Sequence, residues 1–261
     1  MTLNYTAYLK LDDLLSLQRP VSSPPEHDET LFIIIHQTYE LWFKQLLHEA
    51  DHLTELLRAD SLGSAGHTLK RMRTIVKLLV SQMDVLETMT PQEFLSFRDR
   101  LESASGFQSS QFRELEFALG MKQPRVMAPF AEGTPQRALL ERRLKSQTVW
   151  DAFLAFVDRK GHKVPGEILD RDVEEPVAAS EAVQDRLQEI YAEDPGLADF
   201  CELMADLDEG LQEWRYRHVK MVERTIGNKT GTGGSSGVDY LKSTLFKPFF
   251  PDLWDFRSKI G

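Results

Sequence analysis

The chain has 261 residues, 41% of them hydrophobic, one cysteine and a formal net charge of -10. This length allows a substantial core, and the acidic excess argues against nucleic acid or an anionic membrane as a partner, because phosphate binding needs a surplus of lysine and arginine. The single Cys201 excludes an internal disulfide, and no apolar run reaches about 18 residues, so we expect a soluble, cytoplasmic protein.

Apolar residues recur at helical spacing along most of the chain, and no segment shows the alternation of a strand, so we predict an all-α bundle of long helices. We expect one domain over residues 1–261, in which residues 121–180 are the candidate for a small inserted helical subdomain. In chain order, the expected helices span residues 6–17, 28–58, 66–88, 91–101, a stretch ending at 119, 135–145, 147–159 and 195–226.

Several helix boundaries carry capping signals. Thr90, Pro91 and Glu93 have the spacing of an N-cap, a first-turn proline and a capping-box partner. Gly120 and Gly227 each follow a helical pattern and are expected to end it, since glycine readily adopts the left-handed conformation of a helix end.

The segment GNKTGTGGSSG, residues 227–237, follows the last long helix. It is not a phosphate-binding P-loop, because Lys229 precedes the glycine cluster. It is not a dinucleotide fingerprint either, because Ser236 stands at the third glycine and a helix comes before the motif. Two interpretations are left: a flexible surface loop, and a nest of backbone N–H groups and hydroxyls that holds a carboxylate.

A histidine lies on the apolar face of that last long helix. His218 falls at helical spacing from Leu211, Trp214, Met221 and Thr225, so its imidazole is expected to face the core. Such a histidine is either a core residue with a local hydrogen bond or a ligand. As a ligand, one neutral imidazole between apolar walls suits the axial position of haem better than a zinc site, which needs three or four convergent ligands.

A competing metal pattern occurs on the helix expected at 28–58. His48, Glu49 and His52 match the H-E-x-x-H spacing of zinc metalloproteases, which places both histidines on one helix face. However, that class of enzyme also needs a third ligand and usually an edge strand to hold the peptide, and this sequence predicts no strand. The pattern is therefore read as a solvated polar face.

Two further polar residues occur among aromatic ones. His36 shares a helix side with Phe32 and is either a structural or a functional buried histidine. Arg98 stands beside Phe97 and one turn after Phe94. Burying its guanidinium requires an anion such as a carboxylate; the alternative is a surface arginine paired with a neighbouring acid.

Taken together, four stretches closely resemble the tryptophan 2,3-dioxygenase family. They are YTAYLKLDDLL near the amino terminus, FIIIHQTYELWFKQLLHE, EFLSFRDRLESASGFQSSQFRELE and WRYRHVKMVERTIGNKTGTGGSSGVDYL, in the family's order. The resemblance implies an enzyme with haem b between its helices, which uses ferrous iron and O2 to open the indole C2–C3 bond of L-tryptophan, giving N-formylkynurenine in the kynurenine pathway.

The resemblance also assigns roles around the haem and the amino-acid end of the substrate. His218 matches the proximal iron ligand, and His36 matches the distal histidine that meets the indole N–H. Arg98 matches the residue that pairs with the substrate carboxylate. Thr232, within the glycine-rich loop, matches a hydroxyl that helps to hold the amino-acid end.

Other matching positions concern the indole pocket and the assembly. Phe32, Phe94 and Phe97 match pocket residues, and Ser105 matches a serine near the haem. Tyr5 matches a tyrosine that enters a neighbouring subunit's pocket, so a homotetramer with sites completed by the amino-terminal segment is implied.

Three alternatives stay open at this point. A family member of secondary metabolism could insert a single oxygen into tryptophan or a methyltryptophan and form an oxindole. The chain could instead be a haem or tryptophan sensor without turnover, or a purely structural helical bundle.

Overall fold

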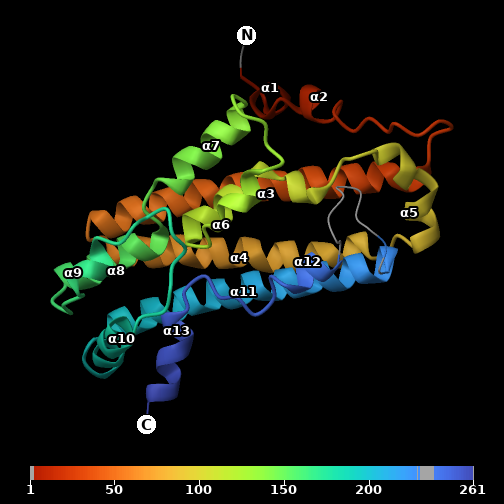
Figure 1. Ribbon diagram of the computed structural model, residues 1–261. Coiled ribbons are helices and arrows are strands. Elements are labelled where there is room, and N and C mark those ends of the chain that lie inside the picture. The colour runs from red at the N-terminus through yellow and green to blue at the C-terminus, as the bar shows by residue number, and fades with distance from the viewer. Residues whose placement is uncertain (1–2, 228, 230–237, 261) are drawn as a thin grey trace.

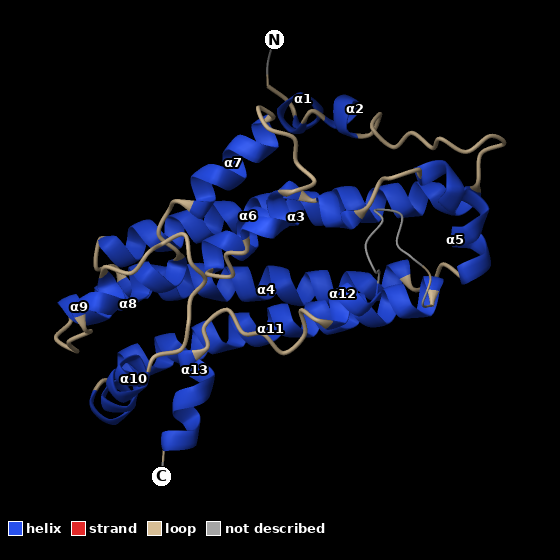
Figure 2. Ribbon diagram, viewed as in Figure 1, coloured by secondary structure: helices blue, strands red, loops and turns tan. Residues whose placement is uncertain are grey.

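In the computed structural model of this protein, the structure describes residues 3–227, 229 and 238–260. Every regular element within these residues is helical, which confirms the all-α prediction (Figure 2). The α-helices are α1 (Tyr5–Leu9), α2 (Leu11–Leu14), α3 (His27–Arg58), α4 (Leu62–Leu86), α5 (Pro91–Arg98), α6 (Ser110–Leu119), α7 (Pro135–Leu144), α8 (Val149–Arg159), α9 (Gly166–Leu169), α10 (Glu181–Glu193), α11 (Pro195–Ile226), α12 (Val238–Lys242) and α13 (Asp252–Asp255).

Three long helices form the frame of the molecule. Helix α4 packs against α3 on one side and against α11 on the other, and the three run side by side (Figure 1). Helices α6 and α8 cover α3, whereas α10 and α13 pack together and contact α11. None of the described helices combines the length and the apolarity needed to cross a bilayer.

Most expected helix boundaries are close to the observed ones. The helices expected at 28–58 and 195–226 are confirmed within one residue as α3 and α11. The capping box at α5 is confirmed, because the Thr90 hydroxyl accepts a hydrogen bond from the Glu93 N–H at 3.3 Å and the Glu93 carboxylate accepts one from the Thr90 N–H at 2.7 Å. The same helix is α-helical only as far as Arg98 and then tightens into a 3-10 turn.

Two glycines end helices as expected. Gly120 ends α6 at a φ of 117°, and Gly227 ends α11 at a φ of 60°. At Gly120 a Cβ atom would also lie 2.6 Å from the Val177 side chain. Glycine is therefore required there both by the backbone conformation and by the space available.

The amino-terminal prediction is wrong in part. The helix expected at 6–17 is two short helices, α1 and α2, separated by Lys10 at a φ of 54°. Neither helix buries a residue, so no packing against the core favours a continuous helix over the break. Helix α10 was missed, because its buried stripe is narrow and Ser180 makes no side-chain cap.

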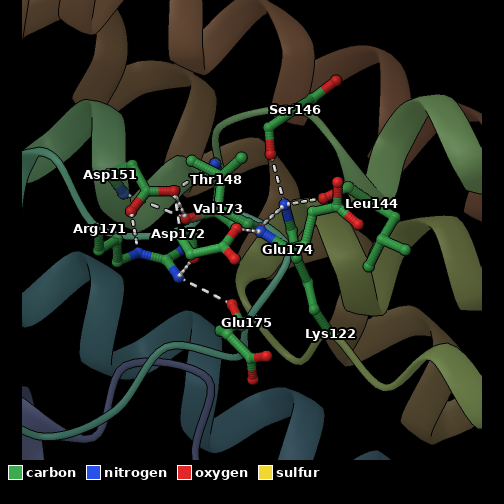
Figure 3. Close-up of polar contacts among 10 residues, drawn as sticks. All are labelled: Lys122, Leu144, Ser146, Thr148, Asp151, Arg171, Asp172, Val173, Glu174 and Glu175. Carbon is green, nitrogen blue, oxygen red and sulfur yellow. Dashed lines mark hydrogen bonds and ion pairs between the residues drawn. The ribbon is translucent and has the colours of Figure 1, made fainter.

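A buried lysine ties three separate parts of residues 121–180 to one another (Figure 3). The Lys122 side chain is 1% exposed, and its ammonium donates to the carbonyl oxygens of Leu144 at 2.7 Å, Val173 at 2.6 Å and Ser146. Burial lowers the pKa of Lys122 to about 8. The ammonium satisfies carbonyls at the end of α7 that have no partner within that helix. The division of the chain into one domain with an inserted subdomain stays a prediction.

Candidate active site

A cavity of about 260 Å³ lies between α3, α4, α5, α6, α11 and α12. Helix α5 lies at one end of the long helices (Figure 1). The cavity wall brings together residues that are far apart in the sequence. Six of the nine predicted site residues line it: Phe32, His36, Phe94, Arg98, Ser105 and His218.

His218 faces this cavity from α11. One turn earlier, Trp214 lies parallel to it, with ring centroids 5.5 Å apart and an interplanar angle of 1°. Burial, with smaller contributions from His36 and Arg113, lowers the pKa of His218 to about 4. The imidazole is therefore neutral near pH 7, which is the form that binds a metal, and it makes no hydrogen bond with any residue that the structure describes.

His36 contributes a second imidazole from α3. Its Nδ1 lies 2.7 Å from the carbonyl oxygen of Phe32, so this nitrogen must carry the proton and donate to the carbonyl. Burial lowers the pKa of His36, which keeps the ring neutral. With Nδ1 engaged as a donor, Nε2 carries a lone pair and can accept a hydrogen bond from an N–H group in the cavity.

The predicted phenylalanines form an aromatic cluster beside His36. The Phe32 ring centroid lies 4.1 Å from that of His36, 5.7 Å from that of Phe94 and 5.6 Å from that of Phe97. Phe32 and Phe94 line the cavity, whereas Phe97 is fully buried and packs behind them. The cluster gives the cavity an apolar wall that suits a flat ring system.

The remaining predicted residues have different positions. Arg98 is the last residue of α5 and brings a positive charge to the cavity, and Ser105 caps the 3-10 turn that begins at Gly106. Tyr5 is 74% exposed on α1 and does not line the cavity of its own chain. Thr232 lies outside the described residues.

A buried charge cluster in the cavity wall was missed by the sequence analysis. Arg113 Nη1 donates to Glu116 Oε2 at 2.6 Å, and Arg215 Nη2 donates to Glu116 Oε1 at 3.1 Å. Each of the three residues is 5% exposed, and together their side chains carry one net positive charge. The spacing of arginine and glutamate in QFRELE was the available signal for Arg113 and Glu116.

Arg215 is buried, although it lies off the apolar stripe that contains His218 on α11. Its guanidinium stacks on Phe249 at 4.5 Å and donates to the Lys247 carbonyl at 3.1 Å, in addition to Glu116. A second buried face exists because the carboxyl-terminal segment covers this side of α11, which helical spacing alone does not reveal.

The cavity has the features that an iron porphyrin needs. His218 offers one neutral axial nitrogen between apolar walls. Among the described residues, Arg113 Nε is a buried donor without an acceptor in hydrogen-bonding geometry. It lines the same cavity as part of a charge cluster with a net positive charge, which suits the two carboxylates of a haem.

The histidine pair outside the cavity is arranged differently. His48 and His52 are exposed on α3, whereas Glu49 between them is buried. The Glu49 carboxylate accepts two hydrogen bonds from Arg71 Nη1, at 2.9 and 3.0 Å. Glu49 is thus committed to a link between α3 and α4, and it is not directed toward the two histidines.

Comparison with known proteins identifies close relatives. A family model described as tryptophan 2,3-dioxygenase matches residues 1–163 and 136–260. A tryptophan 2,3-dioxygenase from Herpetosiphon aurantiacus is 55% identical over 258 residues, covering 99% of this chain and 98% of that protein. Proteins of the same name from Anaeromyxobacter sp. (strain K) and Serratia proteamaculans are 52% and 42% identical, each over 99% of this chain and over 96% and 94% of their own lengths.

Proposed function

Because the chain belongs to the tryptophan 2,3-dioxygenase family, we propose that it opens the indole ring of L-tryptophan at the C2–C3 bond with O2, giving N-formylkynurenine. The observation that carries this proposal is the pair of neutral imidazoles, His36 and His218, that face one apolar cavity from different helices together with Arg98. An enzyme of this kind acts in tryptophan catabolism.

Members of this family are haem enzymes. We propose that this chain holds haem b, with His218 as the axial ligand. The propionates would then meet the positive side of the cavity, where Arg113 Nε is a donor without an acceptor among the described residues. When bound, ferrous haem would supply the centre at which O2 is activated.

The other side chains of the cavity would bind and orient the substrate. His36 Nε2 would accept a hydrogen bond from the indole N–H, since Nδ1 is occupied by the Phe32 carbonyl. Phe32 and Phe94 would contact the indole and exclude water. Arg98 would pair with the substrate carboxylate.

The glycine-rich loop would hold the amino-acid end of the substrate. On the family resemblance, Thr232 contributes a hydroxyl there, and the small side chains of the loop let its backbone approach the ligand.

The amino-terminal segment would act on another subunit. Tyr5 is exposed, and α1 and α2 bury no residue in their own chain, which favours docking elsewhere. We therefore infer a cytoplasmic homotetramer in which Tyr5 completes a neighbouring site.

One experiment tests the activity. Reduced, haem-loaded protein is incubated with L-tryptophan and isotopically labelled O2, and the product is weighed. Two labelled oxygen atoms in the product support the proposal. A single labelled atom would indicate an oxindole, and a tryptophan-perturbed haem spectrum without product would indicate a sensor; either result refutes it.

The iron ligand is tested by haem content. His218→Ala should lose its haem, whereas His36→Ala should retain haem and lose only part of the activity, since it orients the indole. Equal haem content in wild type and His218→Ala would remove His218 as the ligand.

A further inference from the structure

Glu116 is the one carboxylate that joins the two buried arginines of the cavity wall. It lies on α6 and reaches Arg113 on its own helix at 2.6 Å and Arg215 on α11 at 3.1 Å, with one carboxylate oxygen for each. All three side chains line the cavity and all three are buried. Removal of Glu116 would therefore leave two guanidinium charges side by side in the wall.

The guanidinium groups cannot easily move away from each other. Arg113 is packed between the rings of Phe107 at 4.6 Å and Phe112 at 5.4 Å. Arg215 lies on Phe249 and is further held by the Lys247 carbonyl. Their positions are thus set by packing as well as by the carboxylate, and Glu116 mainly sets the net charge of the cluster.

A buried charge in the cavity wall has a strong electrostatic interaction with any group bound in the cavity. Burial reduces the screening by water, so the interaction between the cluster and a nearby redox centre is larger than at a protein surface. A net positive charge favours the reduced, more electron-rich state of an iron porphyrin, and charge beside the cofactor is one of the levers by which proteins set its potential.

We propose that Glu116 holds the buried cluster of Arg113, Glu116 and Arg215 at one net positive charge, and that this charge tunes the ferric/ferrous equilibrium of the bound haem. The inference rests on the proposed function, because it needs haem in the cavity. It concerns the one-electron couple of the cofactor, in which the ferric form takes up one electron to give the ferrous form, and it adds no step to the reaction.

The test is a charge series measured in haem-loaded protein. Glu116→Gln raises the cluster to two positive charges, and Arg215→Gln lowers it to zero. The double variant restores a single positive charge without either residue. Each protein is titrated with dithionite in the presence of redox mediators, and the midpoint potential is read from the haem spectrum.

We expect the potential to follow the charge: highest in Glu116→Gln, lowest in Arg215→Gln, and equal in wild type and the double variant. The ferrous-to-ferric ratio at a fixed potential should rise at least tenfold in Glu116→Gln, which corresponds to about 59 mV for a one-electron couple. Glu114→Gln is the matched control. Glu114 is equally buried on α6 but faces Arg143 at 3.8 Å and does not line the cavity, so its loss should leave the potential near the wild-type value.

Potentials that do not follow the charge order, or a double variant that resembles either single variant, would overturn the inference. If Glu116→Gln does not fold, Arg215→Gln and the double variant still decide the outcome, because they must differ from each other in the stated direction. Failure of the proposed function has a different signature: wild-type protein would then retain no haem or yield no N-formylkynurenine.

Discussion

Asp208, a buried carboxylate of α11, binds several donors of the carboxyl-terminal segment. Asp208 has no exposed surface, and it accepts hydrogen bonds from the backbone N–H groups of Phe249 and Phe250, from Trp254 Nε1 at 3.1 Å and from Gln212 Nε2 at 3.2 Å. Three of these four donors belong to the segment that covers α11. Asp208→Ala would remove all of their acceptors at once.

The expected cost follows from the groups left behind. A buried donor without a partner costs about 1 to 3 kcal/mol, and loss of the carboxylate also relieves the desolvation that raises the pKa of Asp208. We therefore expect Asp208→Ala to lower the free energy of unfolding by about 3 to 5 kcal/mol. Asp208→Asn, which keeps one acceptor oxygen, should cost about half as much.

Urea unfolding followed by circular dichroism measures both values, with amide hydrogen exchange at Phe249 and Phe250 as the local readout. Exchange at these two amides should accelerate in Asp208→Ala before it does so in α3. The reasoning would be refuted if Asp208→Ala lost less than about 1 kcal/mol, since two buried amides could then do without their acceptor.

Three other substitutions have expected outcomes. Gly120→Ala should destabilise the fold by about 1 to 3 kcal/mol in thermal unfolding, because of the left-handed φ and the contact of a Cβ atom with Val177. Gly133→Ala is the control, since Gly133 has a φ of 79° but open space around it, and it should cost less. Equal costs for the two variants would contradict the steric argument. Burial raises the pKa of Asp252 to about 6, so its contribution to stability is fully present below about pH 4 and is lost as the pH rises through 6. The difference in the free energy of unfolding between wild type and Asp252→Asn, measured by urea titration from pH 4 to 7, should therefore fall as the pH rises. A difference that does not change with pH would refute this expectation. Lys122→Met should cost about 2 to 4 kcal/mol by leaving three carbonyls without a donor, and an unchanged urea midpoint would show that water replaces the ammonium.

Local sequence signals were sufficient for the frame of the fold. The capping box at Thr90, the glycine at 120 and the long apolar stripes of α3 and α11 each act within a few residues, so helical spacing could find them. The same logic failed for α1 and α2, in which no residue is buried by the part of the chain that the structure describes. Helix boundaries that depend on tertiary packing cannot be predicted from the spacing of apolar residues within the segment.

In the candidate site, too, some features could be predicted from local spacing and others could not. The inward direction of His218 and His36 follows from helical periodicity, and the family resemblance supplied their expected roles. The pairing of Glu116 with Arg215 joins positions 99 residues apart in the sequence, and it depends on how α6 docks against α11 and on the segment around Phe249. No periodicity within one helix can indicate such a pair.

The contacts of Lys122 also bear on how this protein tolerates mutation. Its ammonium binds main-chain oxygens at positions 144, 146 and 173, and a main-chain oxygen is the same whichever amino acid carries it. The lysine should therefore be hard to replace, whereas Ser146 and Val173, which are both half-buried, should accept many residue types. In a saturation library selected for folded protein, position 122 should therefore tolerate few substitutions, whereas positions 146 and 173 should tolerate many.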